Sequence, residues 1–139
     1  MKFIVGLLLI IAVTQKQKIV CDCDGEPYPI DTAYKLSTHM FTGKVVRIES
    51  KRTLNRKGEF TGVTTITFDS TVSLKGTYKK PVEIATDNSD CRINFKIGKT
   101  YLVGAIYDST LRLPFVDQCF FGCPDISNGE VKKFLERRN

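Results

Sequence analysis

Six runs of β-branched, aliphatic and aromatic residues follow one another along most of the chain, and polar or glycine-containing turns separate them. The runs lie at residues 40–50, 60–74, 81–86, 91–97, 100–108 and 110–119. Runs of this composition between turns are typical of β-strands. The run at 60–74 is long for one strand and predicts a bend or bulge, and Pro114 predicts that the last strand is an edge strand or is bulged.

Helical patterns flank these runs on both sides. Before them, Asp31 is a candidate N-cap of a short helix. After them, apolar residues at helical spacing predict a helix over about 129–138, with Ser127 or Asn128 as its cap. The apolar face of this second helix consists of Val131, Phe134 and Leu135.

Five or six strands followed by one helix predict an all-β fold with a terminal helix. Closing the strands into a barrel would remove exposed strand edges, and a five-stranded Greek-key barrel of the OB type fits the number of strands. A β-sandwich is the alternative. The sequence has no internal repeat and no linker, so one domain is expected over 21–139.

The first twenty residues resemble an export signal. An unbroken run of eleven apolar residues, FIVGLLLIIAV at 3–13, follows a positively charged start and precedes a polar segment. A transmembrane helix needs about 20 apolar residues, so the run predicts a secretory signal over 1–20, a secreted, extracellular protein and no membrane span. The small residues before the bond 14/15 favour cleavage there, whereas cleavage at 20/21 would make Cys21 the first residue of the mature chain.

The distribution of charge argues against a nucleic-acid partner. The whole chain carries 21 Lys and Arg residues against 15 Asp and Glu, a net charge of +6. Lys2, Lys16 and Lys18 precede Cys21 and all acidic residues follow it, so the balance from Cys21 onward is 18 against 15, or +3. An excess this small is not typical of proteins that bind polyanions.

Missing residue types exclude several catalytic classes. The single histidine, His39, rules out a site that needs two imidazoles, and we expect it in a strand or turn. The sequence has no glycine-rich phosphate loop and no G-x-S-x-G nucleophile motif. We therefore expect that the protein is not an enzyme and has no cofactor of its own.

Five cysteines follow the apolar segment, and export makes disulfides their expected state. They are Cys21, Cys23, Cys91, Cys119 and Cys123. Their spacings do not match the C-x2-C pattern of structural zinc sites. Because five is an odd number, at least one thiol is free or pairs outside the chain, and the cysteine pattern alone leaves the connectivity open.

Cysteines and strands together form an ordered series of motifs. Cys-x-Cys at 21–23 is followed by GKVV at 43–46, VSLKG at 72–76, PVEIAT at 81–86, a cysteine after a polar loop, IGKTYLVGA at 97–105 and a closing cysteine. From residue 21 to about 138, this series resembles the netrin-like module and, within it, the inhibitory N-terminal domain of the tissue inhibitors of metalloproteinases. The resemblance implies the disulfides Cys21–Cys91 and Cys23–Cys119, with Cys123 unpaired or intermolecular.

The resemblance also implies a function, namely inhibition of secreted or cell-surface zinc metalloproteases. The α-amine and carbonyl oxygen of Cys21 would chelate the zinc of the partner protease, so the metal is shared with the partner. A further implied partner is the extracellular matrix. The implied inhibitory edge consists of Cys21, Asp22, Cys23, Asp24, Ser89 and Asp90.

The chain departs from the family pattern in three respects. Asp22 replaces the small residue, often Ser or Thr, that usually separates the first two cysteines. A family cysteine expected near Lys35 or Leu36 and its partner beyond the final helix are both missing, and Cys123 has no family counterpart. The alternative is therefore a secreted netrin-like module that binds matrix or a signalling ligand without inhibiting a protease.

Overall fold

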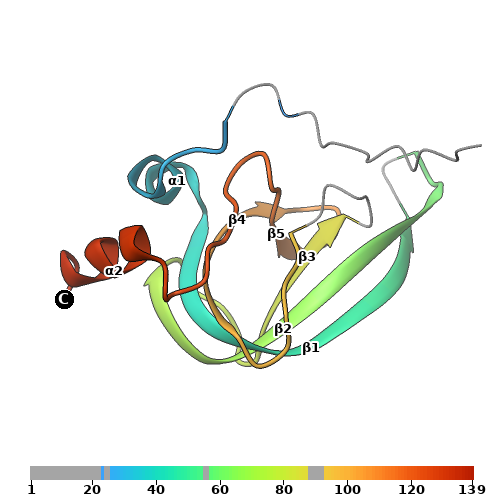
Figure 1. The fold of residues 1–139 in the computed structure, drawn as a ribbon. Coiled ribbons are helices and arrows are strands. Elements are labelled where there is room, and N and C mark those ends of the chain that lie inside the picture. The colour runs from blue at the N-terminus through green and yellow to red at the C-terminus, as the bar shows by residue number, and fades with distance from the viewer. Residues whose placement is uncertain (1–22, 24–25, 55–56, 88–92) are drawn as a thin grey trace, which may run out of the picture.

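The structure, a computed structural model, describes residues 23, 26–54, 57–87 and 93–139 (Figure 1). The elements are α1 (Ile30–Leu36), β1 (His39–Leu54), β2 (Phe60–Lys75), β3 (Val82–Asp87), β4 (Thr100–Asp108), β5 (Leu113–Phe115) and α2 (Gly129–Glu136). The strands form a closed barrel in the order β1-β2-β3-β5-β4, in which β4 pairs back with β1. The prediction of a mostly-β chain with five strands is confirmed, and the sheet closes into a ring rather than forming two stacked layers.

The two longest strands, β1 and β2, form a bent hairpin that projects beyond the barrel (Figure 1). Their register runs from Met40↔Lys75 to Leu54↔Phe60 and shifts at three places, one of which is a bulge where β2 has one extra residue between Asp69 and Val72. Ser70 lies inside this bulge with φ 49°. A bulge bends its strand and increases the twist, so the bend predicted for the run at 60–74 is confirmed.

The last strand is much shorter than the predicted run at 110–119. Only Leu113–Phe115 is a strand; it pairs antiparallel with β4 and, through Ala85↔Phe115, parallel with β3. Pro114 has no N–H to give to a ladder, and Arg112 just before the strand has φ 56°. The chain therefore turns on both sides of β5, which explains why the predicted long strand is wrong.

The predicted strand at 91–97 is also wrong. Residues 93–97, the part of this run that the structure describes, do not form a strand. Phe95 instead enters the core, where its ring lies edge-on to the rings of Phe68 and Tyr101 at centroid distances of 5.7 and 5.0 Å. The N–H of Lys96 donates to the Tyr101 hydroxyl at 3.0 Å rather than to a neighbouring strand. An apolar run that contributes to the core without pairing in the sheet therefore has the composition of a strand.

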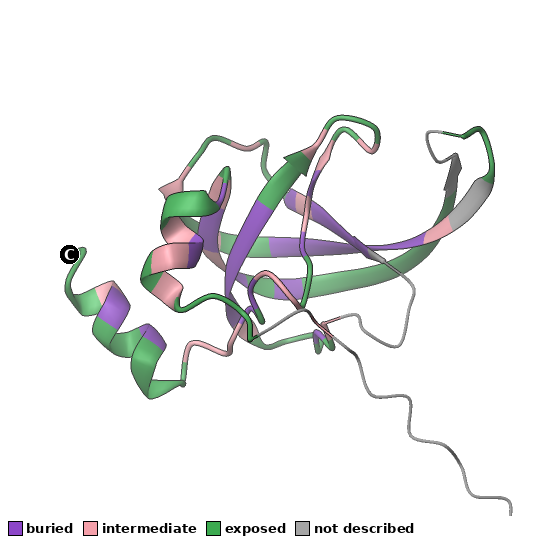
Figure 2. Cartoon of the chain, turned by 90° about the horizontal axis from the view of Figure 1, so that it is seen from above, coloured by how far each residue is buried: buried purple, intermediate pink, exposed green. Residues whose placement is uncertain are grey.

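The two helices, α1 and α2, lie side by side on one side of the molecule (Figures 1 and 2). Helix α1 begins after Pro29 and has no side-chain cap, so the prediction that Asp31 caps it is wrong. Asp31 lies in the first turn, where its carboxylate pairs with Arg137 at 3.1 Å. Helix α2 begins after Asn128, whose side-chain oxygen accepts a hydrogen bond from the N–H of Glu130 at 2.9 Å. Of the two predicted caps, Ser127 and Asn128, the structure therefore confirms Asn128.

Buried residues lie along the barrel strands and include positions in both helices (Figure 2). An edge-to-face aromatic pair, Phe41 and Phe68, stands at its centre with ring centroids 5.2 Å apart. From α2, Val131 and Phe134 are fully buried, while Leu135 is partly buried, so the predicted apolar face of this helix packs on the barrel side. In the described part of the chain, no helix has the length and apolar character needed to cross a bilayer.

Candidate functional site

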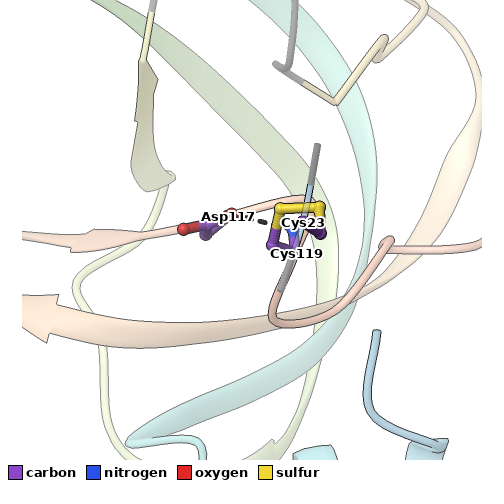
Figure 3. The surroundings of a disulfide bond; sticks show 3 residues. All are labelled: Cys23, Asp117 and Cys119. Carbon is purple, nitrogen blue, oxygen red and sulfur yellow. Dashed lines mark hydrogen bonds between the residues drawn. A yellow bond between two sulfur atoms is a disulfide. The ribbon is translucent and has the colours of Figure 1, made fainter. Parts of the chain in front are cut away.

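A disulfide joins the N-terminal lead to the turn that follows β5. Cys23 and Cys119 are 96 residues apart in sequence, and their Cα atoms are 5.4 Å apart (Figure 3). This is one of the two pairs that the family resemblance implies. The bond therefore fixes the start of the described chain against the end of the barrel strands.

The turn that carries Cys119 is itself held by Asp117. Its carboxylate accepts a hydrogen bond from the N–H of Cys119 at 2.8 Å (Figure 3). Its carbonyl oxygen accepts hydrogen bonds from the N–H groups of Phe120 and Phe121 at 3.1 and 3.0 Å. Side chain and backbone of one residue thus fold residues 117–121 into a tight turn that presents the sulfur of Cys119.

The lead has a second attachment at Tyr28. The N–H of Tyr28 donates to the carbonyl oxygen of Phe120 at 3.0 Å, and the two rings meet edge-on with centroids 5.7 Å apart. Cys23 and Tyr28 are therefore both fastened to the same turn. A segment anchored at two points loses little conformational entropy when it binds a partner.

The barrel topology shows which end the disulfide occupies. Strands β3 and β5 run parallel, so Asp87 and Phe115 end their strands at the same end of the barrel. The turn that holds Cys119 follows directly after β5. The disulfide and the C-terminus of β3 are thus placed at one barrel end.

Most of the predicted inhibitory edge lies outside the described residues. This applies to Cys21, Asp22, Asp24, Ser89 and Asp90, and Cys91, the implied disulfide partner of Cys21, lies outside them as well. The Cys21–Cys91 disulfide and chelation of a protease zinc by Cys21 therefore stay predictions. Among the described residues, no group of three or more His, Cys, Asp or Glu side chains is arranged to hold a metal ion.

The fifth cysteine, Cys123, carries a free thiol that is 2% exposed. Its sulfur faces the carbonyl oxygens of Phe121 and Gly104 at 3.6 and 4.0 Å. Burial raises the pKa of this thiol to about 12, and the contact with Gly104 lowers it by a smaller amount. A thiol that stays protonated at neutral pH is a poor nucleophile and a poor metal ligand, so Cys123 acts as a packing residue.

A concave site lies at the end of the barrel opposite the Cys23–Cys119 disulfide, where β1 begins and β4 ends. It has a volume of about 270 Å³ and is lined by His39, Tyr78, Lys79, Glu83, Tyr107 and Arg112, among others. His39 is in β1, as expected for a strand or turn residue. None of the six was predicted as a site residue, because they come from separate loops and strand ends that no local pattern connects.

No protein-family model matches this chain, and no curated protein matches it. The function is therefore inferred from the chain's own residues and from the resemblance in its motifs.

Proposed function

We propose that this chain is a secreted protein inhibitor of zinc metalloproteases that chelates the protease zinc through the N-terminal Cys21. The observation that carries the proposal is the Cys23–Cys119 disulfide, which ties the residue two positions after Cys21 to the barrel end. This is one of the two bonds that the resemblance to tissue inhibitors of metalloproteinases implies.

The fold supports the proposal at a coarser level. We propose that the five-stranded barrel is of the OB type and belongs to the netrin-like module. The strand order β1-β2-β3-β5-β4, with antiparallel pairs everywhere except between β3 and β5, fits a five-stranded Greek-key barrel. The helix α2 at the C-terminus fits the same module.

The attachment of the lead gives the proposed edge its stiffness. In an extended segment, successive side chains point in opposite directions. Because the side chain of Cys23 is turned to the barrel by its disulfide, we expect that of residue 22 to point away, toward a partner. The second attachment, from Tyr28 to Phe120, limits movement of the lead from the other side.

The proposed chemistry at Cys21 needs a free α-amine. That amine and the carbonyl oxygen of the same residue can close a five-membered chelate ring on zinc. A catalytic zinc keeps one position open for water, and the chelate would displace this water and so remove the nucleophile. A terminal amine has an ordinary pKa of about 7.7–8.0, so zinc displaces its proton at low cost near neutral pH.

The experiment compares the mature protein with a variant that carries one alanine before Cys21. A matched control carries one alanine after Asn139. We expect the N-terminal extension to weaken inhibition of a zinc metalloprotease at least 100-fold, because an amide nitrogen is a very poor zinc ligand. The C-terminal extension should leave inhibition unchanged, and both proteins should unfold at the same temperature.

Mass measurement of the secreted protein is the second part of the test. The proposal requires a mature chain that begins at Cys21. A mature chain that begins at Gln15 and still inhibits at full strength would refute chelation.

The alternative is a netrin-like module that binds matrix or a signalling ligand. The disulfide also fits this alternative, because closing a loop of this length stabilises a fold by about 4–5 kcal/mol in the chain-entropy model. A correctly processed chain that begins at Cys21 and inhibits none of a panel of zinc metalloproteases would favour this alternative.

A further inference from the structure

The concave site at the end of the barrel remote from the disulfide has features of a ligand site. It lies where β1, β3 and β5 begin, whereas the disulfide follows the end of β5. We call it the basic aromatic cleft and define it by His39, Tyr78, Lys79, Glu83, Tyr107 and Arg112. Metalloprotease inhibition as proposed above makes no use of these residues.

The aromatic part of the cleft is a cluster of three tilted rings. The imidazole of His39 lies between two tyrosines, with its centroid 5.5 Å from that of Tyr78 and 6.3 Å from that of Tyr107. The interplanar angles are only 35° and 34°, so the rings lie closer to parallel than to perpendicular. The ring of Tyr107 belongs to a residue that is 48% exposed, which leaves a flat apolar surface open to a ligand.

Hydrogen bonds hold two of these rings in place. The Tyr78 hydroxyl donates to the carbonyl oxygen of Met40 at 2.8 Å. The Thr38 hydroxyl lies 2.8 Å from Nδ1 of His39 and also accepts a hydrogen bond from the N–H of Tyr107 at 2.7 Å. The rings of His39 and Tyr78 are therefore held in place before any ligand arrives, so little ordering is needed on binding.

The charged part of the cleft is cationic. Lys79 and Arg112 are both exposed at the cleft, and neither forms an ion pair with a carboxylate of the described residues. The acidic residue of the cleft, Glu83, is already engaged, because its carboxylate oxygen lies 3.4 Å from Nζ of Lys51. Two cations that have no ion pair within the described part of the chain thus line the cleft together with an exposed tyrosine.

We propose that the basic aromatic cleft binds an aromatic ring that carries an oxyanion, such as a carboxylate, a sulfate ester or a phosphate ester. The ring stacks on Tyr107, and the oxyanion is held by Arg112 and Lys79. The guanidinium fork of arginine matches the oxygens of such groups. A volume of about 270 Å³ is near the lower end of small-molecule pockets, so the cleft holds one substituted ring rather than a polymer.

The same chemistry has two sources, a free aromatic acid or ester and a modified tyrosine on a partner protein. The mature protein, labelled with ¹⁵N, is titrated with O-sulfotyrosine, O-phosphotyrosine and 4-hydroxyphenylacetate. N-acetyltyrosinamide supplies the ring without the anion, and sodium sulfate supplies the anion without the ring. We expect the three aryl oxyanions to shift the amide signals of Tyr107 and Arg112. We also expect them to bind at least tenfold more tightly than N-acetyltyrosinamide or sulfate.

A matched pair of variants tests the role of charge. Arg112→Gln should weaken binding of O-sulfotyrosine at least tenfold, whereas Arg52→Gln, which removes an exposed arginine in β1, should leave it unchanged. Tyr107→Leu should also weaken binding at least tenfold, and an unchanged unfolding temperature for each variant shows that the fold is intact. The proposal is overturned if no aryl oxyanion shifts these signals at 10 mM, or if the two arginine variants lose the same affinity.

The last arm distinguishes the two sources. A short peptide that contains sulfotyrosine is compared with the free amino acid. Affinity at least tenfold higher for the peptide assigns the cleft to a modified partner protein, and equal affinity assigns it to a free aryl oxyanion. Both results support binding of an aryl oxyanion in the cleft, and neither result depends on whether the chain inhibits a protease.

Discussion

Arg138 stacks its guanidinium over the ring of Tyr34, with the guanidinium carbon 3.7 Å from the ring centroid. The same carbon is 4.6 Å from the centroid of Phe134. Tyr34 belongs to α1, whereas Arg138 follows α2, so this contact joins the two helices. The pair Asp31–Arg137 lies beside it on the surface, and exposed pairs of this kind contribute little stability. Attachment of α2 to the barrel therefore depends mainly on its buried apolar side chains.

Phe134→Ala should lower the free energy of unfolding by about 3–5 kcal/mol, as loss of a buried phenylalanine usually does. Phe134 is fully buried, and its ring lies 5.9 Å from that of Tyr34. Urea denaturation measures the change. Lys132→Ala on the exposed face of the same helix is the control and should stay within about 0.5 kcal/mol of the wild type. Equal effects would show that α2 does not pack as described.

Gly76→Ala should be more destabilising than Gly58→Ala, although both glycines have similar backbone angles, with φ 82° and 78°. A Cβ atom at Gly76 would lie 2.6 Å from the carbonyl oxygen of Thr38, whereas a Cβ at Gly58 would meet nothing within 4 Å. Each substitution carries a cost of about 1 kcal/mol for a left-handed alanine, and only the first adds a clash with the backbone. Thermal unfolding of the two variants should differ by several degrees. Equal unfolding temperatures would contradict the close approach of residue 76 to the start of β1.

Cys123 should make the fold sensitive to alkaline pH. Its thiol pKa is raised from 9.0 to about 12 by burial, so folding favours the protonated form. The stability that this preference contributes is complete below pH 9 and is lost as the pH rises through 12. Unfolding free energies of the wild type and of Cys123→Ala, measured from pH 8 to pH 11, should fall more steeply for the wild type. Parallel curves would show that the thiol is not sequestered.

Alkylation gives a second measurement on the same thiol. At pH 8 the folded protein should react with iodoacetamide at Cys123 far more slowly than the protein in concentrated urea, as peptide masses can show. Fast modification without denaturant would contradict the burial of this side chain.

The proposed inhibitory edge makes a specific prediction about Asp22. If its carboxylate enters an apolar pocket beside the zinc, an unpaired charge is buried there at a cost of a few kcal/mol. Asp22→Thr should then tighten inhibition of proteases with deep apolar pockets and weaken it where the pocket offers an Arg or Lys. Inhibition constants against one protease of each kind measure this. If the substitution changes neither constant, residue 22 does not enter the pocket, and the binding module becomes the better assignment.

Local patterns predicted most of the strands and the second helix, whereas tertiary contacts decided the rest. The run at 60–74 and the Asn128 cap were predictable because spacing and capping act within a few residues. The run that contains Phe95 was misassigned because Phe95 packs in the core without strand pairing, and an apolar segment of this kind has the composition of a strand. The basic aromatic cleft was not predictable, since His39 and Tyr107 come together only through the pairing of β1 with β4.

The short last strand has a consequence for how the chain assembles. Antiparallel ladders alone join β4, β1, β2 and β3 into an open sheet, and the ring is completed only through β5, by a single pair with β3, Ala85 and Phe115. β5 is also the last of the described strands in the sequence, so its pair with β3 forms only after the other four strands have been synthesised. A growing chain that has reached Asp108 therefore holds four strands whose outer edges are both unpaired, the state most open to intermolecular strand pairing. The three residues of β5 convert that sheet into a closed barrel. Cys119, four positions after Phe115, then joins the end of β5 covalently to Cys23.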